Sequence, residues 1–482
     1  MDSWRSLLAR LEREALLLPF VALYVIFVLA FLPKELVQDG WLALLAGREV
    51  AENGLPHSDT LTVWAQGREW VDQQWLAQLF FYGLHAAGGL KLVMLANALL
   101  VAGAFALAVT FARRWGAKPL AVALVAFAYV FIAPWSLQMR AQSLAYPLFV
   151  GLLWLLAADS RSPSRRVFLV LPLLALWANL HGSVLLGAGL VGLHAVLSVL
   201  PVAWSGRLDL SRLSRAACLV AGPALCVFAS PYGFALVGYY RSLFDPAIAR
   251  YVVEWQQSVP SAATAAFYAV AAAALVLLVR QRKVLTVFEQ AVLVAGIGAA
   301  GLAVRNIVWF ALAALALLPV LVSAALPARA EGAPRRKGVN LALVGASVVA
   351  ILAAVAVAAS RPTSWYRADW PAEAVVAAVG RHPASTVFPS TRYADWLLFE
   401  APQLRGRVVY DIRFELLTDR ELKSLYDFRR RAGRGWQDVA LASDAVVLDP
   451  ETSREIVSAL LARPGTSVAY RHERVVVLRV RR

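Results

Sequence analysis

Charged and polar side chains interrupt the long apolar runs of this sequence at a few junctions, and these junctions are where chemistry could take place. A polar group at membrane depth is costly, so it usually has a functional reason. Asp39 follows the first apolar run. The other junction residues are Arg140, Gln142, Asn179, His181, Tyr232, Glu254 and Arg305. We expect all of them on one side of the membrane, drawn into a single cavity.

The residue types at these junctions suit a substrate that carries a phosphate. Arginine is permanently charged and grips phosphate oxygens in a fork, and histidine can donate to the same group. A nearby carboxylate can act as general base on an incoming hydroxyl. The groups together would fit sugar transfer from a polyprenyl phosphate, in which the departing phosphate needs electrostatic stabilisation.

The composition of the chain indicates a membrane protein. Of its 482 residues 60% are hydrophobic and 16% are charged, with a mean hydropathy of +0.62, whereas soluble domains average about 45–50% apolar and about 25% charged residues. This excludes an ordinary cytosolic domain and a disordered chain, and two cysteines are too few for a disulfide scaffold. The net charge of +16 resides mostly in short clusters between apolar runs, which is a topology signal and not a nucleic-acid footprint.

Eleven apolar runs approach the length of about 20 residues that a membrane-spanning helix needs. They lie at roughly 15–33, 91–112, 119–138, 143–159, 167–180, 184–204, 216–231, 262–279, 284–303, 306–327 and 339–359. The alternating loops place 19 basic residues on one side and eight on the other. Because loops rich in Lys and Arg stay in the cytoplasm, we predict a polytopic α-helical protein of the bacterial inner membrane, with its N-terminus inside and its C-terminus outside.

Two parts of the chain outside the predicted spans are long enough to carry function. Residues 34–90 form a long first outer loop, in which the apolar piece 75–88 is too short to span and is expected at the outer interface. In residues 361–482 short strand-like segments alternate with helix-like ones, which favours a small extracytoplasmic α/β domain. The strand-like segments are STVFPS, RVVYDI, DAVVLD, TSVAY and RVVVLRV, and the helix-like segments are AEAVVAAVG, DRELKSLYDFRRR and SREIVSALLA. We therefore divide the chain into a transmembrane domain, 1–360, and a soluble domain, 361–482.

Several segments resemble a known family. An acidic residue just after the first membrane helix, here in Gln38-Asp39-Gly40, is similar to the GT-C superfamily of glycosyltransferases that use polyprenyl-phosphate sugars. Further segments resemble bacterial GT-C-like membrane proteins, and they run over most of the chain: DTLTVWAQGREWVDQQWLAQLFFY, MRAQSLAYPLF, LWANLHGS, SPYG, VEW and ADWLLFEAPQLRGRVVYDIRFELL.

The resemblance implies roles for residues of the first outer loop. Asp39 matches the catalytic base of the family, and Glu69 and Asp72 are candidates for its second acidic residue. Gln74 stands beside Trp75 at a position where relatives often carry Glu. The identity of the second acidic residue therefore stays open, and so does the presence of a divalent metal that this residue would help to hold. GT-C enzymes typically invert the anomeric centre, and many need no metal.

Other interpretations of the same residues remain open at this stage. Asp39 could cap the following helix, and Arg140 and Arg305 could extend to the outer headgroups. The function predicted from the resemblance is glycosyl transfer at the outer leaflet, from a polyprenyl-phosphate donor to an envelope glycan, lipid or protein, with the lipid bilayer as a partner and no nucleic acid. The alternatives are a non-catalytic scaffold of envelope polysaccharide assembly and a transporter or flippase.

Overall fold

In the computed structural model, each apolar run of the sequence contains a helix within the part of the chain that the structure describes. The described residues are 15, 17–30, 36, 38–204, 210–327, 337–362, 372–380, 382 and 384–481. The helices of the apolar runs are α2 (Leu18–Ala30), α4 (Trp75–Arg114), α5 (Pro119–Ile132), α6 (Ala145–Arg161), α7 (Val170–Ala178), α8 (Val184–Trp204), α9 (Leu210–Val227), α12 (Ala265–Arg280), α13 (Val287–Leu302), α14 (Ile307–Ala325) and α15 (Lys337–Ser360).

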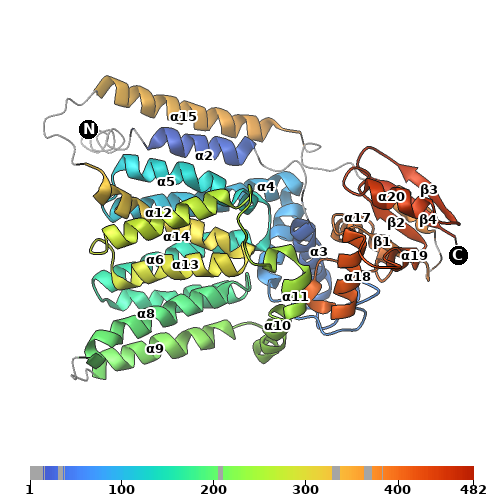
Figure 1. The fold of residues 1–482 in the computed structure, drawn as a ribbon, viewed down its shortest axis with the longest axis horizontal. Helices are drawn as coiled ribbons and strands as arrows, with labels where there is room; N and C mark the ends of the chain where they lie inside the picture. Colours follow the sequence, from blue (N-terminus) through green and yellow to red (C-terminus); the bar gives the residue numbers. More distant parts are fainter. Residues whose placement is uncertain are drawn as a thin grey trace.

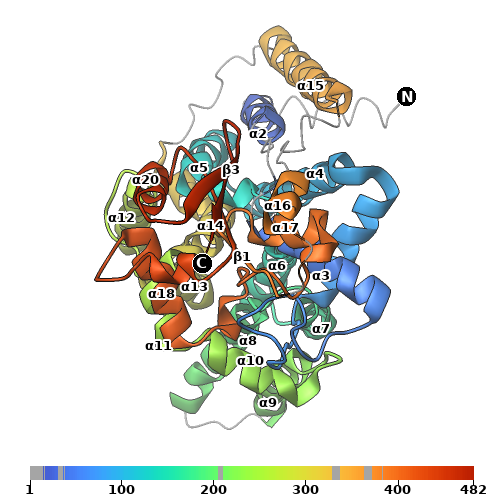
Figure 2. The same cartoon turned by 90° about the vertical axis from the view of Figure 1, so that its right-hand side faces the viewer.

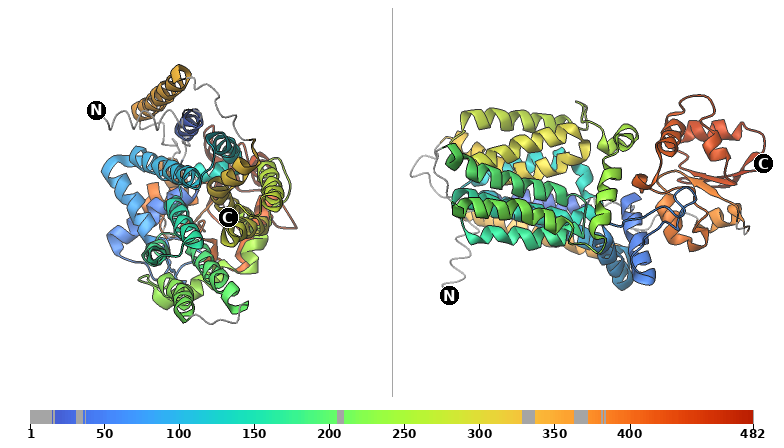
Figure 3. Two further views of the ribbon diagram at one scale, coloured as in Figure 1. Left: turned by 90° about the vertical axis from the view of Figure 1, so that its left-hand side faces the viewer. Right: turned by 90° about the horizontal axis from the view of Figure 1, so that it is seen from below.

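The helices lie side by side in an elongated bundle, and the C-terminal domain sits at one end of it (Figure 1). In the views along the bundle, α14 lies near the centre (Figures 2 and 3), and almost all of its side chains are buried. Helices α2 and α15 pack against each other along one side of the bundle. The outward faces of the peripheral helices are apolar, with Leu99, Val349 and Leu352 among the most exposed side chains. Such a surface suits a lipid solvent.

Helix lengths agree with a multi-pass membrane protein. Among the described residues, five helices are long and apolar enough to cross a membrane, and five further apolar helices are shorter, at 10–17 residues. Helix α7 has only nine residues. The chain is therefore a multi-pass membrane protein, while the number of eleven spans and the orientation of the chain stay predictions.

The piece 75–88 forms the first part of α4. A break in helical geometry at Gly88 and Gly89, where Gly89 has φ 66°, separates this part from the long second part. The first part packs against α3 (Gln38–Asn53), and Gly47 makes this close crossing possible because a Cβ there would lie 2.2 Å from the carbonyl oxygen of Gln78. The break lets the first outer loop lie across the end of the bundle.

Short helices connect the long ones at the two ends of the bundle. On the end that faces the C-terminal domain they are η1 (Pro134–Leu137), η2 (Ala141–Leu144), η4 (Gly233–Ala235), α10 (Leu236–Leu243), α11 (Pro246–Tyr251), η5 (Val253–Trp255) and η6 (Val304–Asn306). The opposite end carries η3 (Arg165–Leu169). The tight turns of the first group bring polar side chains of distant segments to one place.

The C-terminal domain is a small α/β unit, as the alternation of segments predicts. Its sheet has the order β1-β2-β4-β3, with β1 parallel to β2 and the other pairs antiparallel. The strands are β1 (Val387–Pro389), β2 (Ala445–Leu448), β3 (Thr466–Arg471) and β4 (Val476–Val480). The helices are α16 (Ala372–Val379), α17 (Ala394–Glu400), η8 (Pro402–Leu404), η9 (Phe414–Leu416), α18 (Asp419–Arg430), α19 (Asp438–Leu441) and α20 (Arg454–Leu461).

One segment that reads as a strand, RVVYDI at 407–412, forms only isolated bridges. Val408 pairs with Val387 of the domain on one side and with Thr62 of the first outer loop on the other. The segment therefore lies between the domain and the outer loop, and it forms single bridges where the sequence predicts a strand.

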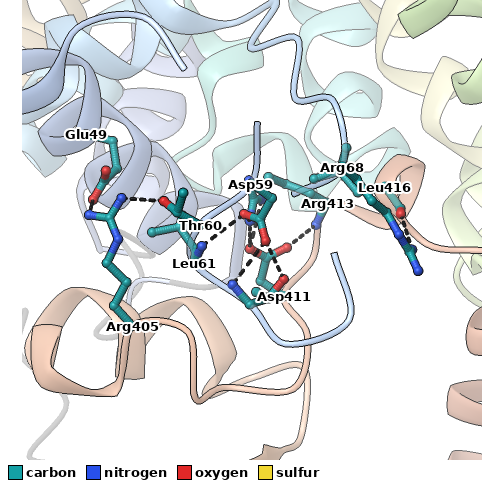
Figure 4. A network of polar contacts seen from close by, with 10 residues as sticks. Glu49, Asp59, Thr60, Leu61, Arg68, Arg405, Asp411, Arg413 and Leu416 are labelled. Carbon is teal, nitrogen blue, oxygen red and sulfur yellow. Dashed lines mark hydrogen bonds and ion pairs between the residues drawn. The ribbon is translucent and has the colours of Figure 1, made fainter. Parts of the chain in front are cut away.

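Ion pairs join the first outer loop to the C-terminal domain (Figure 4). Arg413 lies 2.5 Å from Asp59, and Arg405 lies 2.8 Å from Glu49. Arg68 donates to the backbone carbonyl of Leu416 at 2.6 Å. The loop and the domain thus form one polar interface, which we call the clamp.

Candidate functional site

A cavity of about 730 Å³ lies between the end of the bundle and the C-terminal domain. Residues from α3, η2, the α7–α8 turn, α10, η5, η6 and the C-terminal domain line it. Six of the residues that the sequence nominates contribute to the lining: Asp39, Arg140, Gln142, His181, Glu254 and Arg305. The convergence expected from the sequence is therefore present for this group.

Arg140 joins the two acidic residues of the cavity. Its Nε lies 3.1 Å from Asp39 Oδ2, and its two terminal nitrogens bind both oxygens of Glu254 at 2.8 and 3.1 Å. The Arg140 side chain is only 15% exposed, while the Asp39 side chain is 41% exposed and faces the cavity. Asp39 lies in the first turn of α3, where the helix dipole favours a negative charge. The arginine thus holds two carboxylates in fixed positions beside the open space.

The two carboxylates differ in their affinity for protons. Burial raises the pKa of Asp39, although Arg140 acts in the opposite direction. Burial also acts on Glu254, but Arg140, which binds it through two hydrogen bonds, and Arg305 together hold its pKa below the usual range. Asp39 is therefore the better candidate to accept a proton, and Glu254 the better candidate to stay ionised.

Arg305 is the more available of the two cavity arginines. Its guanidinium carbon lies 4.1 Å from the centre of the Trp255 ring, a cation–π contact. Within the described residues, no ion pair connects it to a carboxylate. Its donors are therefore free to bind an anionic ligand in the cavity, whereas the terminal nitrogens of Arg140 already donate to Glu254 and Gln138.

His181 presents a defined tautomer to the cavity. Its Nδ1 accepts from the backbone N–H of Ser183 at 3.1 Å and lies 2.7 Å from the Ser183 hydroxyl, which in turn accepts from Trp177 Nε1. We infer that the ring proton sits on Nε2, because Nδ1 acts as the acceptor. Burial, assisted by Arg305 and Arg140, lowers the pKa of His181 to about 3, so the ring is a neutral donor at physiological pH.

Four nominated residues lie outside the lining of this cavity. Glu69 is exposed and pairs through its backbone with Ser58. Asn179 is engaged with Trp75 and with the carbonyl oxygens of Ala175 and Ala229. The Tyr232 hydroxyl donates to the carbonyl of Pro56. These contacts hold the turns around the cavity together.

Asp72 is the fourth of these residues, and it is buried near the cavity without lining it. It is 3% exposed, and its Oδ2 has no hydrogen-bond partner among the described residues. Burial raises its pKa to about 7. Gln74 and Gln78, which follow it in the chain, do line the cavity. The amides therefore occupy positions that a second carboxylate would need in order to reach a substrate.

The cavity also contains residues that the sequence does not nominate. From the bundle they are Gln38, Gln74, Gln78 and Tyr239, and from the C-terminal domain they include Thr391, Arg413, Glu415, Tyr426 and Arg429. The adjacency of Gln38 to Asp39 was a signal in the sequence. Nothing comparable marked the C-terminal residues, because they reach the cavity only through tertiary contacts: the clamp, the packing of α17 on α3 and the packing of α18 on α11.

The acidic residues of the cavity do not fit a divalent metal. Asp39 and Glu254 lie on either side of the Arg140 guanidinium, which supplies the positive charge between them. In the described part of the chain, no group of three His, Cys, Asp or Glu side chains is arranged to hold a metal ion. Asp59, which stands two residues after His57, binds Arg413 and Thr62 instead.

Comparison with solved structures identifies the fold. The chain is similar to ArnT from Cupriavidus metallidurans in the apo state, with 16% identity and a TM-score of 0.54 over 99% of this chain and 98% of ArnT. The structure of the same protein bound to undecaprenyl phosphate matches with 16% identity and a TM-score of 0.52 over the same shares. No protein-family model and no curated protein matches the sequence. This likeness shows that the two proteins share a fold over nearly their whole length.

Proposed function

We propose that this protein is an integral-membrane glycosyltransferase that moves a sugar from a polyprenyl-phosphate donor to an envelope acceptor on the outer side of the bacterial inner membrane. The observation that carries the proposal is the cavity, in which an available arginine, a neutral histidine and a carboxylate share one space at the end of the bundle. The similar ArnT structure bound to undecaprenyl phosphate supports the class of donor. The concentration of basic loops at the opposite end supports the orientation.

The donor phosphate would bind Arg305. This guanidinium faces the cavity, and within the described residues no ion pair occupies its fork, which leaves the fork open for phosphate oxygens. His181 Nε2–H would donate to the same phosphate. Both groups gain interaction energy as the phosphate leaves with a full extra negative charge, and this differential binding is what accelerates the step.

Asp39 would act as the general base. The acceptor hydroxyl oxygen forms a bond to the anomeric carbon while the bond from that carbon to the phosphate oxygen breaks, and its electron pair goes to the phosphate. The hydroxyl proton moves to the carboxylate of Asp39. Arg140 acts as a positioning residue, because it fixes Asp39 at 3.1 Å and is itself anchored by Glu254. A direct displacement of this kind inverts the anomeric centre.

The test is transfer in vitro by purified protein in lipid nanodiscs, with a panel of radiolabelled undecaprenyl-phosphate sugars and isolated envelope fractions as acceptors. We expect one donor to be used by the wild type and Asp39→Asn to lose about 10²–10⁴-fold in kcat, the usual contribution of a general base. Glu52→Gln, an exposed acid on the same helix, is the matched control and should retain activity.

The same variant separates an enzyme from a scaffold or a transporter. Asp39→Asn should fold and insert normally and yet fail to complement a deletion strain. Full complementation by Asp39→Asn, together with no transfer from any donor by the wild type, would reject the proposal in favour of a non-catalytic role.

A further inference from the structure

The cavity has two halves with different chemistry. Asp39, Arg140, His181, Glu254 and Arg305 come from the helical bundle and form what we call the floor. Glu415, Tyr426 and Arg429 come from the C-terminal domain and form what we call the roof. The proposed phosphate and proton chemistry uses only the floor, so the roof has no part in the reaction as described so far.

Glu415 is held rigidly at the roof. It lies in the short helix η9, directly before Leu416, whose carbonyl accepts from Arg68 at 2.6 Å. Two residues before it stands Arg413, bound to Asp59 of the outer loop (Figure 4). The clamp thus fixes the backbone on both sides of Glu415. A carboxyl group that is held in place by two interdomain contacts and lines a cavity is preorganised for a ligand.

The carboxyl group of Glu415 has no side-chain partner in the described part of the chain. The residue is half-buried, and it lines the cavity. In contrast, the two acids of the floor are both bound to Arg140. A carboxylate repels a phosphate, so Glu415 is unsuited to the anionic part of the donor. It is suited to a group that donates hydrogen bonds, such as a hydroxyl.

Two tyrosines form an aromatic part of the wall of the same cavity. Tyr251 ends α11 of the bundle and Tyr426 lies in α18 of the C-terminal domain, and their ring centres are 5.5 Å apart. Both line the cavity, and the exposed Arg429 lies one turn further along α18. Aromatic faces with a few convergent polar groups are typical of small-molecule sites, and sugar rings offer both an apolar face and a rim of hydroxyls.

We propose that the roof is a carbohydrate subsite, in which Glu415 accepts hydrogen bonds from ring hydroxyls of the acceptor and Tyr426 packs against a sugar ring. Arg429 binds the part of the acceptor that extends outward. This assignment rests on the proposed function and adds the class of acceptor, a saccharide whose hydroxyl is presented to Asp39 from the side of the C-terminal domain. The C-terminal domain then selects the acceptor, while the bundle binds the donor.

The experiment compares two fates of the donor sugar in the full-length protein in nanodiscs. The radiolabelled undecaprenyl-phosphate sugar that the wild type uses is supplied either in water alone or with a panel of methyl glycosides of hexoses and heptoses. Transfer of the sugar to a glycoside requires the roof, which would bind the glycoside. Slow transfer of the same sugar to water, that is, hydrolysis of the donor, requires only the floor. We expect Glu415→Gln to lower kcat/KM for the best glycoside by about tenfold or more, as expected for hydrogen bonds to a charged group, and to leave hydrolysis and the donor KM unchanged.

Three further variants keep the test independent of folding. Tyr426→Phe keeps the ring and should transfer like the wild type, whereas Tyr426→Ala removes it and should raise the KM for the glycoside. Glu451→Gln, at an exposed acid of the same domain that does not line the cavity, is the control for Glu415→Gln and should behave as the wild type.

The outcomes separate this inference from the proposed function. If no donor is hydrolysed or transferred, the proposed function fails. Hydrolysis without transfer to any glycoside overturns the carbohydrate subsite and leaves the enzyme in place. An equal loss of hydrolysis and transfer in Glu415→Gln also overturns it, because Glu415 would then act on the donor.

Discussion

The two ends of helix α6 lie beside the same kinds of charged residue, but these residues differ in how far the protein itself satisfies their hydrogen bonds. Near its first residue, Ala145, lies the cavity with Arg140, Asp39 and Glu254. Near its last residue, Arg161, lie Asp159 and Glu289. The helix has 17 residues, so roughly 25 Å separates the two ends. We call them the cavity end and the closed end.

At the closed end, the hydrogen-bonding capacity of the acids is met. Glu289 is fully buried and accepts from Arg161, Trp115 and the backbone of Thr286. Asp159 accepts from His194, from Arg215 and from the backbone of Ser164. A buried charge with its partners supplied is a structural feature, and both oxygens of each of these acids already accept hydrogen bonds.

At the cavity end, by contrast, donors and acceptors are left over. Within the described residues Arg305 has no carboxylate partner, Glu415 has no side-chain partner, and His181 directs Nε2 away from its own contacts with Ser183. The comparison teaches that residue type does not separate a functional cluster from a structural one. What separates them is whether the protein itself already satisfies the charges.

The largest difference between the two ends should appear in turnover. Arg305→Gln removes the charge that stabilises the departing phosphate, and we expect kcat to fall by about 10²–10³-fold, the usual loss for one such donor. Arg161→Gln, the matched change at the closed end, should leave kcat per folded molecule unchanged. The kcat of both variants is measured with the same donor in nanodiscs. A comparable loss of kcat in both would contradict the proposal that only the cavity end takes part in the reaction.

Stability should show the reverse pattern. Asp159→Ala leaves His194, Arg215 and the Ser164 amide without their shared acceptor, and we expect a loss of about 3 kcal/mol in the free energy of unfolding, as when one partner of a buried ion pair is removed. Thermal unfolding in detergent would show this as a lower Tm than for the wild type. Glu52→Ala is the exposed control, and an unchanged Tm for Asp159→Ala would contradict the structural role of the closed end.

The smallest expected effect is a pH dependence of the KM for a glycoside, and it tests the role of Glu415 in the roof. Burial raises the pKa of Glu415 to about 7. The titratable and charged groups that face it are Asp411 and Arg413 of its own domain, together with Asp72, Tyr239 and Arg305. Because the ionised carboxylate accepts hydroxyl hydrogen bonds, the KM for a glycoside should fall as the pH rises from 6 to 8, by up to about tenfold for one such group.

The slope with pH should vanish in Glu415→Gln, because that variant has no group to titrate at this position. Asp39 contributes to kcat, so the measurement is the KM for the glycoside at saturating donor and not the overall rate. A slope that persists in Glu415→Gln would assign the titration to another group, and a KM that rises with pH would contradict the hydroxyl assignment.

Much of the fold could be predicted from the sequence, because its determinants are local. Apolar runs form helices in lipid whatever their neighbours are, and the alternation in the tail predicts α16, α18 and α20 where they occur. The segment 407–412 was predicted as a strand, and in the structure its Val408 forms single bridges to Val387 and to Thr62, which lies more than 300 residues away in the chain. Pairing over that separation leaves no local pattern.

The candidate site could be predicted in part for a related reason. Polar residues between apolar runs have to lie at an end of the bundle, so Asp39, Arg140, His181, Glu254 and Arg305 were recognisable from position alone. Position does not tell which way a side chain points. Asn179 and Tyr232 occupy equivalent junctions, but their polar atoms are used by neighbouring turns.

The sequence by itself determined that this chain enters a membrane, that its polar residues collect at helix ends, and that a small α/β domain follows, since hydropathy and periodicity act over tens of residues. Only the tertiary structure decided which of these charges are already neutralised and which are open. It also brought Glu415 and Tyr426 over the cavity, because the Arg413–Asp59 contact anchors the segment of Glu415 and α18 packs on α11 beside Tyr426. That placement depends on the energy of contacts between segments hundreds of residues apart, and no neighbouring residues in the chain encode it.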